Sequence, residues 1–225
     1  MSILPAIPSA AVMIVRDVDG SPEVLLVRRN TKIAFHGGSW VFPGGKVDAA
    51  DQLLDNDPDE LQLARRAAAR EVSEEAGVAV DALSLTTFGH WTTPENQPKR
   101  FATWFFATQV SAETNVEIDG SEIVDHRWLT VEDALELRAS NEFTLPPPTF
   151  VSLKKLQRFS DSRTFLQHLG DTGAERFMPR VVDLDNGRCS LYQEDAGYDA
   201  LDLALGGARH RLYMLESGWE YIREF

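Results

Sequence analysis

Three carboxylates on one predicted helical turn constrain this chain more than any other feature. Glu71, Glu74 and Glu75 stand at positions i, i+3 and i+4, which share one face of a helix. Carboxylates placed so close together repel each other, and the arrangement costs stability unless a cation lies among them. Arg70 lies one turn before Glu74 and can hold a carboxylate with its planar guanidinium. Because hard oxygen ligands suit Mg²⁺ or Mn²⁺, which also bind phosphates, the run predicts a site for one of these ions.

The segment around this run has the start and stop signals of a helix. Asp57 is the expected N-cap, Pro58 suits the first helical position, and Glu60 completes a capping box. Apolar residues then recur at helical spacing, and Gly77 supplies the C-terminal stop. The sequence therefore predicts a helix over residues 58–76.

The rest of the chain alternates between strand and helix patterns. Stretches rich in β-branched and aromatic residues predict strands at 10–15, 24–29, 40–42, 83–91, 100–110 and 123–129, with a turn at Asp19-Gly20. Helices are predicted from 130 to about 139, at 149–159 and at 162–169, and hairpins at 181–192 and 210–221. The fold class that follows is α/β, with a mixed sheet that has helices on its faces. Three consecutive prolines indicate a boundary between a domain of residues 1–145 and a C-terminal helical and β-hairpin extension of residues 146–225.

Composition disfavours several classes of partner. The net charge is −13, with 22 basic against 35 acidic residues, so the chain repels nucleic acid and anionic membranes unless a local basic patch intervenes. No apolar run approaches the roughly 20 residues that span a bilayer, and no basic region precedes the apolar N-terminal stretch, so neither a membrane span nor a secretory signal is expected. The single cysteine, Cys189, excludes an internal disulfide. A cytoplasmic location is the default expectation.

Residues 70–78, with the sequence REVSEEAGV, resemble the signature of the Nudix hydrolases. Residues 42–45, with the sequence FPGG, are similar to the loop that opens the same signature. Gly44 and Gly45 let the backbone approach a metal and a phosphate closely. The resemblance implies a Nudix α/β/α sandwich. It also implies metal-dependent cleavage of a phosphoanhydride bond in a nucleoside diphosphate linked to another group.

The signature is altered and lengthened at one point. A glutamate is expected where this chain has Asp51. Between Asp51 and Arg70 lie 18 residues, 11 more than in the signature, which places an insertion at about 52–62. The mostly polar stretch 52–57 predicts a surface loop. Asp51 is therefore not assigned as a metal ligand.

A second motif lies upstream and indicates the substrate. Arg29, His36 and Gly38 stand at the positions of a motif of the coenzyme A diphosphatase branch, whereas Ala34 stands where many members have arginine. Further stretches are similar to the peroxisomal acyl-coenzyme A diphosphatases and their bacterial relatives, although this chain lacks their peroxisomal address. These stretches are 42–51, 91–94, 100–101 and 145–148. The resemblance implies that coenzyme A or acyl-coenzyme A is cleaved to adenosine 3′,5′-bisphosphate and a 4′-phosphopantetheine.

The resemblance implies roles for particular residues. The expected metal ligands are Glu71, Glu74, Glu75 and Gly45. The expected catalytic residues are Glu74 or Glu71, which orients or deprotonates water, with Arg70 and Glu122; Glu122 is preferred over Glu113 and Glu117 in the loop before the strand at 123–129. Coenzyme A is a polyanion, so its site needs cations and close backbone approach. The expected substrate-binding residues are Arg29, His36, Gly44, Gly45, Lys46 and Arg100.

Three functions follow as alternatives. The first is a coenzyme A or acyl-coenzyme A diphosphatase, and the second is a Nudix pyrophosphatase for ADP-ribose, NADH or another dinucleotide. The third is a non-catalytic Nudix ligand sensor, which the presence of all three glutamates disfavours. In each case the expected partner is a small nucleotide, not nucleic acid or a membrane. Residues 146–225 can form a lid or the surface of a homodimer.

Overall fold

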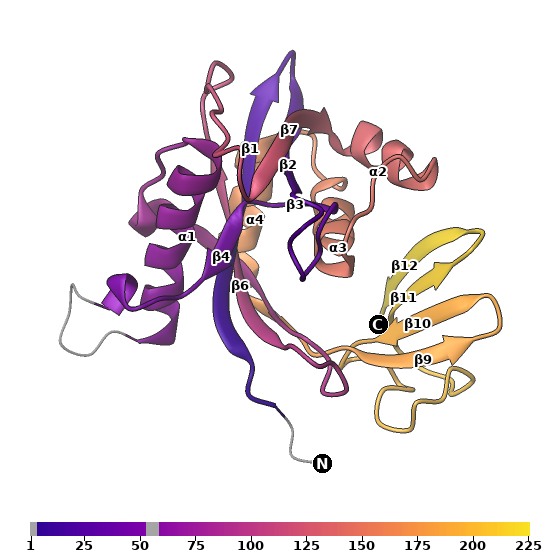
Figure 1. Ribbon diagram of the computed structural model, residues 1–225. Helices are drawn as coiled ribbons and strands as arrows, with labels where there is room; N and C mark the ends of the chain where they lie inside the picture. The colour runs from indigo at the N-terminus through magenta and orange to yellow at the C-terminus, as the bar shows by residue number, and fades with distance from the viewer. Residues whose placement is uncertain (1–3, 53–58) are drawn as a thin grey trace. The chain divides into compact units, whose positions relative to one another are not determined.

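Residues 4–52 and 59–225 are described by the computed structural model, and they divide into two units (Figure 1). The core unit comprises Ile7–His90 and Thr103–Glu175. The C-terminal unit comprises residues 4–6, Trp91–Ala102 and Arg176–Phe225. Helices that follow the three prolines thus belong to the core unit. The division of the chain into a domain of residues 1–145 and an extension stays a prediction.

The first β-hairpin forms the centre of the core unit. Its strands are β1 (Ile7–Val18) and β2 (Ser21–Arg29), which pair antiparallel. Asp19 and Gly20 lie between them with positive φ angles of 50° and 81°, as tight hairpin turns require. The predicted turn is therefore confirmed, and the apolar middle of each strand is buried.

Further strands extend this hairpin into a sheet of eight strands within the described residues. Six of them follow the order β3-β2-β1-β6-β5-β8, while β4 pairs with β1 and β7 pairs with β2. The remaining bounds are β3 Trp40–Val41, β4 Gly44–Lys46, β5 Thr86–Thr92, β6 Phe101–Gln109, β7 Ile123–Thr130 and β8 Glu175–Phe177. The predicted strands are confirmed with small shifts at their ends. Two strands of 3 residues each, β4 and β8, were not predicted.

Helix α1 (Glu60–Ala76) carries the three glutamates. The side chain of Asp59 caps it by accepting a backbone N–H of the first turn, so the N-cap lies two residues later than the predicted Asp57. Asp57 and Pro58 themselves lie outside the described residues, as does most of the predicted surface loop at 52–57. At the other end Gly77, with a φ of 66°, ends the helix as predicted.

The buried face of α1 consists mostly of alanines, which let the helix lie close to the sheet. Its buried apolar residues join one core cluster with those of β1, β2 and β6. The helix contributes Ala64, Ala67, Ala68, Val72 and Ala76, and the strands contribute Val12, Ile14, Leu25, Val27 and Phe106, among others. This close packing brings the last two turns of α1 against the backbone of β4.

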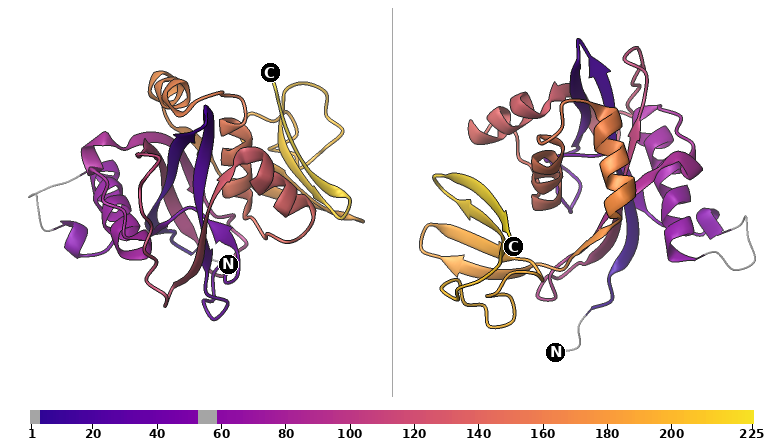
Figure 2. Two further views of the ribbon diagram at one scale, coloured as in Figure 1. Left: turned by 90° about the horizontal axis from the view of Figure 1, so that it is seen from above. Right: turned by 180° about the vertical axis from the view of Figure 1, so that it is seen from behind.

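Three more helices lie within the described residues: α2 (Val131–Ala139), α3 (Pro147–Leu156) and α4 (Ser162–Thr172). They confirm the three helices predicted after residue 130. Figure 2 shows α1 on one side of the sheet and α2 and α3 on the other, which are the layers of an α/β/α sandwich. Within residues 4–52 and 59–225, no helix is both long enough and apolar enough to cross a membrane.

The C-terminal unit contains an antiparallel sheet in the order β12-β11-β10-β9. Its strands are β9 (Arg180–Leu184), β10 (Gly187–Leu191), β11 (Arg209–Leu215) and β12 (Gly218–Glu224), and they confirm the two predicted hairpins. A buried ion pair joins Arg211 Nη2 to Asp195 Oδ1 at 2.6 Å. Asp195 lies in the connection between β10 and β11, so this pair fixes that connection to the sheet.

Candidate active site

The carboxylates of Glu71 and Glu75 face the two glycines of β4. Glu75 is buried, and its Oε2 accepts a hydrogen bond of 2.8 Å from the backbone N–H of Gly44. A Cβ on Gly45 would lie 2.3 Å from the carboxylate of Glu71, so a side chain at that position would displace this carboxylate. Gly44 is equally restricted, because it has a φ of 157° and its Cβ would lie 2.2 Å from the carbonyl oxygen of Ala10. The glycines thus allow α1 and β4 to approach each other at the acidic turn.

Arg70 holds the turn in place through several partners. Its Nη1 contacts Glu71 Oε1 at 2.9 Å and Glu74 Oε2 at 3.1 Å. Its Nε and Nη2 each lie 3.1 Å from an oxygen of Asp51, and Nη2 also donates to the carbonyl oxygen of Lys46 at 2.9 Å. The side chain of Asp51 is only 3% exposed, against 22% for Arg70. Asp51 is therefore a positioning residue for Arg70, a role that the sequence analysis missed because of the insertion that follows it.

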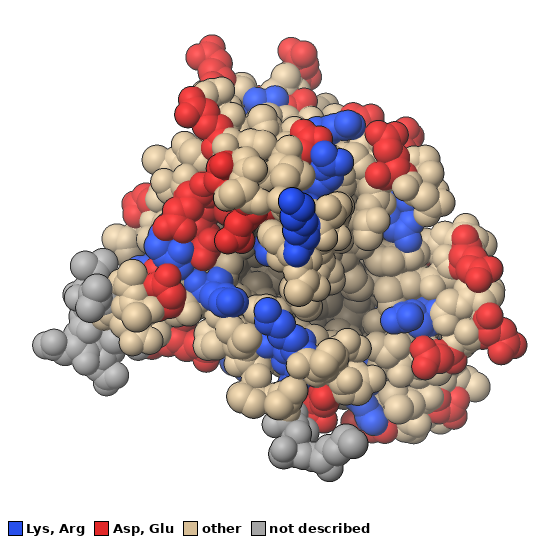
Figure 3. All heavy atoms as spheres, in the orientation of Figure 1, with Lys and Arg blue, Asp and Glu red and all other residues tan. Residues whose placement is uncertain are grey.

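Burial and charge change the acidity of the two inward-facing glutamates. Burial raises the pKa of the Glu75 carboxyl to about 8; the Gly44 N–H and the charge of Arg29 oppose this rise, and the charges of Glu71 and Glu122 add to it. Burial also raises the pKa of Glu71, against the opposing effect of Arg70. The charge of Glu122 adds to the rise in pKa of both glutamates, so the structure brings Glu122 close enough to interact with them electrostatically. Figure 3 shows acidic side chains gathered over the region where Figure 1 draws α1 and β4.

Arg29 supplies a positive charge beside Glu75. Its Nη1 lies 3.9 Å from Glu75 Oε1, and its Nε is buried with no hydrogen-bond partner among the described residues. The loop that follows β2 closes back on it, since Arg29 donates its N–H to Ser39 O at 3.0 Å. Within this loop His36 has an unusual positive φ of 55°. Burial and the charge of Arg29 lower the pKa of His36, which favours the neutral form of its imidazole.

Other predicted site residues are less closely associated with this turn. The side chain of Glu74 is 59% exposed, and that of Lys46 is exposed on β4. Arg100 belongs to the C-terminal unit, where it is buried and donates to the carbonyl oxygens of Thr93 at 3.0 Å and Leu4 at 2.7 Å. These contacts account for its buried charge without a substrate. The roles assigned to all three residues stay predictions.

The donor atoms at this turn fit a hard divalent cation, although they are not gathered into a closed cluster. In residues 4–52 and 59–225, no three histidine, cysteine, aspartate or glutamate side chains lie in a group that could hold a metal ion. Arg70 contacts Glu71 and Glu74, and the Gly44 N–H donates to Glu75, yet the pKa values of Glu71 and Glu75 stay raised, so these partners do not offset the full cost of ionising the two carboxyls. All the candidate ligands are oxygens, which Mg²⁺ and Mn²⁺ prefer.

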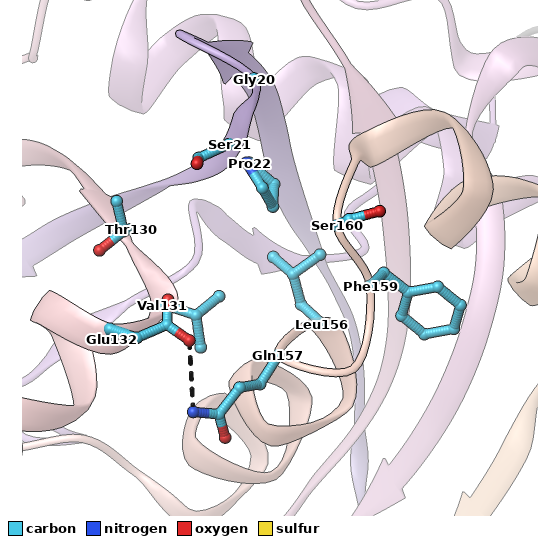
Figure 4. A pocket seen from close by; sticks show the side chains of 10 residues that line it. All are labelled: Gly20, Ser21, Pro22, Thr130, Val131, Glu132, Leu156, Gln157, Phe159 and Ser160. Carbon is cyan, nitrogen blue, oxygen red and sulfur yellow. Dashed lines mark hydrogen bonds between the residues drawn. The ribbon is translucent and has the colours of Figure 1, made fainter.

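A pocket of about 440 Å³ lies elsewhere in the core unit (Figure 4). It is lined by the turn between β1 and β2, the start of α2 and the end of α3. Within it the amide of Gln157 donates to Glu132 Oε1 at 3.4 Å. None of the predicted site residues lines this pocket, so it is separate from the glycine-and-glutamate site.

Comparison with known proteins is consistent with the sequence resemblance. The NUDIX domain model matches residues 6–147. The chain is 26% identical over 174 residues to putative nudix hydrolase 7 of Caenorhabditis elegans, covering 62% of this chain and 57% of that protein. It is 27% identical over 163 residues to acyl-coenzyme A diphosphatase NUDT19 of Xenopus laevis, covering 64% of this chain and 43% of that protein. It is 30% identical over 123 residues to the human protein of that name, covering 52% of this chain and 33% of that protein. The chain therefore spans between about a third and little more than half of the length of these relatives.

Solved structures share the fold of the core. A NUDIX hydrolase from Alicyclobacillus acidocaldarius superposes with a TM-score of 0.65 at 24% identity, covering 74% of this chain and 97% of that one. The NUDIX domain of Shewanella oneidensis NrtR, in complex with ADP ribose, gives a TM-score of 0.52 at 16% identity, covering 69% of this chain and 88% of that one. At these identities the likeness concerns the fold alone, and it confirms the predicted Nudix sandwich. Because the domain model covers more than half of the sequence, this chain belongs to the NUDIX family.

Proposed function

We propose that the chain is a Mg²⁺- or Mn²⁺-dependent hydrolase that cleaves the phosphoanhydride bond of a nucleoside diphosphate linked to another group. The observation that carries this proposal is the turn of α1 that presents Glu71 and Glu75 to the glycine backbone of β4, with the charge of Glu122 nearby. Glu75 is buried and Glu71 is half-buried, and the pKa values of both carboxyl groups are raised, which costs stability when they ionise and becomes favourable around a cation.

The residues that would hold the ion are Glu71, Glu74, Glu75 and the backbone of Gly45. When bound, the ion supplies positive charge that offsets the charge developing on the phosphate oxygens. The missing Cβ at Gly45 supports this assignment, because it leaves the Glu71 carboxylate and the β4 backbone in direct contact. Arg70 holds Glu71 and Glu74 in position, and Asp51 holds Arg70 in turn.

The chemical step requires a base and a water in line with the bond to be broken. Glu71 or Glu74 orients or deprotonates this water, whose oxygen attacks one phosphorus. The bond from that phosphorus to the bridging oxygen breaks, and each product leaves with one phosphate of the cleaved diphosphate. Glu122 adds negative charge close to Glu71 and Glu75, which favours binding of a cation at the turn.

The substrate that we propose is coenzyme A or acyl-coenzyme A. The motif of Arg29, His36 and Gly38 supports it, and so do the printed names of the frog and human relatives, which are acyl-coenzyme A diphosphatases. Arg29 has a buried Nε without a partner, so it has a hydrogen bond to offer to an anion. His36 and the cationic Lys46 are the other proposed contacts. The contact expected of Arg100 stays a prediction, because its guanidinium donates to Thr93 and Leu4 within the C-terminal unit.

The test is product analysis with competing substrates. Purified protein is incubated with Mg²⁺ and a mixture of coenzyme A, acetyl-coenzyme A, ADP-ribose, NADH and diadenosine polyphosphates. We expect adenosine 3′,5′-bisphosphate to appear first. If AMP appears first, the substrate is another dinucleotide and the coenzyme A assignment is wrong. If metal binds and no product forms from any of them, the outcome favours the ligand-sensor alternative.

A matched pair of variants tests the assignment of the fourth carboxylate. Glu122→Gln removes the charge beside Glu71 and Glu75, so it should weaken Mg²⁺ affinity and lower turnover. Glu113→Gln makes the same chemical change at an exposed position of the same connection and should change neither. Equal effects of the two variants would exclude Glu122 from the site.

A further inference from the structure

The four tyrosines of this chain all lie in the C-terminal unit, and their hydroxyls have different partners. Tyr198 donates to the carbonyl oxygen of Met178 at 2.8 Å, and Tyr213 accepts from Arg211 Nη1 at 3.1 Å. The hydroxyl of Tyr192 is fully buried and has no hydrogen-bond partner among the described residues, and burial raises its pKa well above the ordinary range. Only the hydroxyl of Tyr221 has a histidine nitrogen among the partners found in this part of the chain, at 2.7 Å from His210 Nε2.

His210 is itself oriented by a carboxylate. Its Nδ1 lies 2.7 Å from Glu194 Oε2, and its side chain is only 1% exposed, against 46% for that of Glu194. An ionised carboxylate can only accept, so Nδ1 carries the hydrogen. In the neutral imidazole, Nε2 is then the acceptor and the hydroxyl of Tyr221 donates to it. The three side chains therefore form one directed chain of hydrogen bonds from Tyr221 to Glu194.

The sheet places these groups at fixed positions. His210 lies on β11 and Tyr221 on β12, where the register pairs His210 with Arg223 and Leu212 with Tyr221. Alternate residues of a strand share a face, so the imidazole and the phenol belong to the same face. Tyr221 is partly exposed, in contrast to the buried His210. The base is thus shielded from water, whereas its partner belongs to a partly exposed residue.

We propose that Glu194, His210 and Tyr221 form a nucleophilic site that accepts an acyl group from an activated ester or thioester. A nucleophile, a base within hydrogen-bond reach and a third group that orients the base are the arrangement that activates hydroxyls in acyl transfer. The Tyr221 oxygen forms a bond to the carbonyl carbon, and the bond from that carbon to the leaving oxygen or sulfur breaks. The phenol proton passes to His210 Nε2 and then to the leaving group. The products are a tyrosyl ester and an alcohol or thiol.

The surroundings of the imidazole are largely aromatic. The rings of Phe225 and Tyr192 lie 5.9 Å and 4.8 Å from it, and Arg223 on β12 is paired with His210 across the two strands. A neutral carbonyl compound can approach such an apolar surface without losing strong hydration, and the comparison of acetate and phosphate probes tests this choice of electrophile.

The test uses two probes with the same leaving group, p-nitrophenyl acetate and p-nitrophenyl phosphate, on the full chain. Modified tyrosines are identified by peptide mass spectrometry, with Tyr213 as the internal control because it lies on the same sheet and its hydroxyl contacts an arginine instead of a base. We expect Tyr221 to be acetylated about 100-fold faster than Tyr213, the lower end of what a positioned base contributes. The rate should rise with pH in one step, because a protonated imidazole cannot accept the phenol proton.

Two variants separate activation from a structural role. His210→Gln should reduce acetylation of Tyr221 to the rate of Tyr213 and abolish the pH step. Glu194→Gln changes a partly exposed residue, so it keeps the test valid if the buried substitution does not fold; it should slow acetylation and alter the pH profile. Acetylation of Tyr221 and Tyr213 at equal rates, or an unchanged rate and pH profile in Glu194→Gln, would overturn the proposal. Transfer of phosphate in preference to acetate would overturn its choice of electrophile.

Discussion

Replacing Glu75 by glutamine tests both the electrostatics of the acidic turn and its role in binding metal. The amide has the same shape, and its carbonyl oxygen can accept the N–H of Gly44 that Glu75 Oε2 accepts at 2.8 Å. The hydrogen bond is thus kept while the ionisable group is removed. Any difference between the two proteins that depends on pH then reports the charge of Glu75.

The sign of this effect follows from the direction of the pKa shift. Between the ordinary value of 4.5 and the folded value of about 8, the unfolded chain releases the proton and the folded chain retains it. In this window the folded state binds more protons than the unfolded state. The free energy of unfolding of the wild type therefore falls as pH rises across the window and is constant above it. A rise from 4.5 to about 8 corresponds to a penalty on the order of 5 kcal/mol at pH 9. Relaxation and water penetration reduce such penalties, and we expect a measured difference of about 2 kcal/mol or more.

The assay is urea unfolding, followed by tryptophan fluorescence, at pH 5, 7 and 9 in the presence of EDTA. Wild type and Glu75→Gln should be nearly equally stable at pH 5, and the variant should be the more stable protein at pH 9. Parallel pH dependence of the two proteins would refute the reasoning, because it would mean that Glu75 is not held neutral by burial.

Addition of Mg²⁺ should reverse the order. A cation that binds the folded wild type stabilises it by mass action, and the variant lacks the charge that attracts it. Turnover should fall by about 100-fold or more in Glu75→Gln, since a catalytic ion contributes several kcal/mol to the transition state. A variant with a near-wild-type rate would refute the metal assignment.

Three further substitutions test the contacts around the turn and in the C-terminal unit. Gly45→Ala places a Cβ against the carboxylate of Glu71, so isothermal titration should show weaker Mg²⁺ binding. Unchanged affinity would contradict the assignment of Glu71 and the Gly45 backbone to the metal site. Asp51→Asn leaves Arg70 without its buried charged partner, and thermal unfolding should show a loss of about 2 kcal/mol, less than for a fully buried pair because Arg70 is partly exposed. Asp195→Asn breaks a pair whose side chains are 2% and 0% exposed, and chemical unfolding should show a loss of about 3 kcal/mol or more.

Most of the fold could be predicted from periodicity, because long strands and helices repeat their apolar residues at fixed spacing. Helix α1 and the strands of the two C-terminal hairpins were located in this way. The strand β4 was not, because its sequence Gly44-Gly45-Lys46 has neither apolar alternation nor β-branched residues. It is a strand only because β1 offers it hydrogen bonds from a distant part of the chain. Local sequence does not encode such pairing.

The candidate site likewise has features that could be predicted from the sequence and others that could not. The shared face of Glu71 and Glu75 follows from helical geometry, and the sequence predicted it. The proximity of Arg29 to Glu75 depends on how α1 packs against the sheet, so the sequence did not predict it, although a resemblance assigned Arg29 to the substrate site. The hydrogen bond from Gly44 to Glu75 was not predicted at all, since it joins residues 31 positions apart.

The contact between Asp51 and Arg70 explains how the lengthened loop leaves the acidic turn intact. The two residues enclose the 18 residues that include the insertion, and their side chains meet through two contacts of 3.1 Å. The carboxylate of Asp51 is buried and the guanidinium of Arg70 is partly exposed, so this pair fixes the start of the stretch to the acidic turn of α1. Arg70 in turn contacts Glu71 and Glu74. Removing the charge of Asp51 should therefore disturb the position of the glutamates even though the helix itself is unchanged.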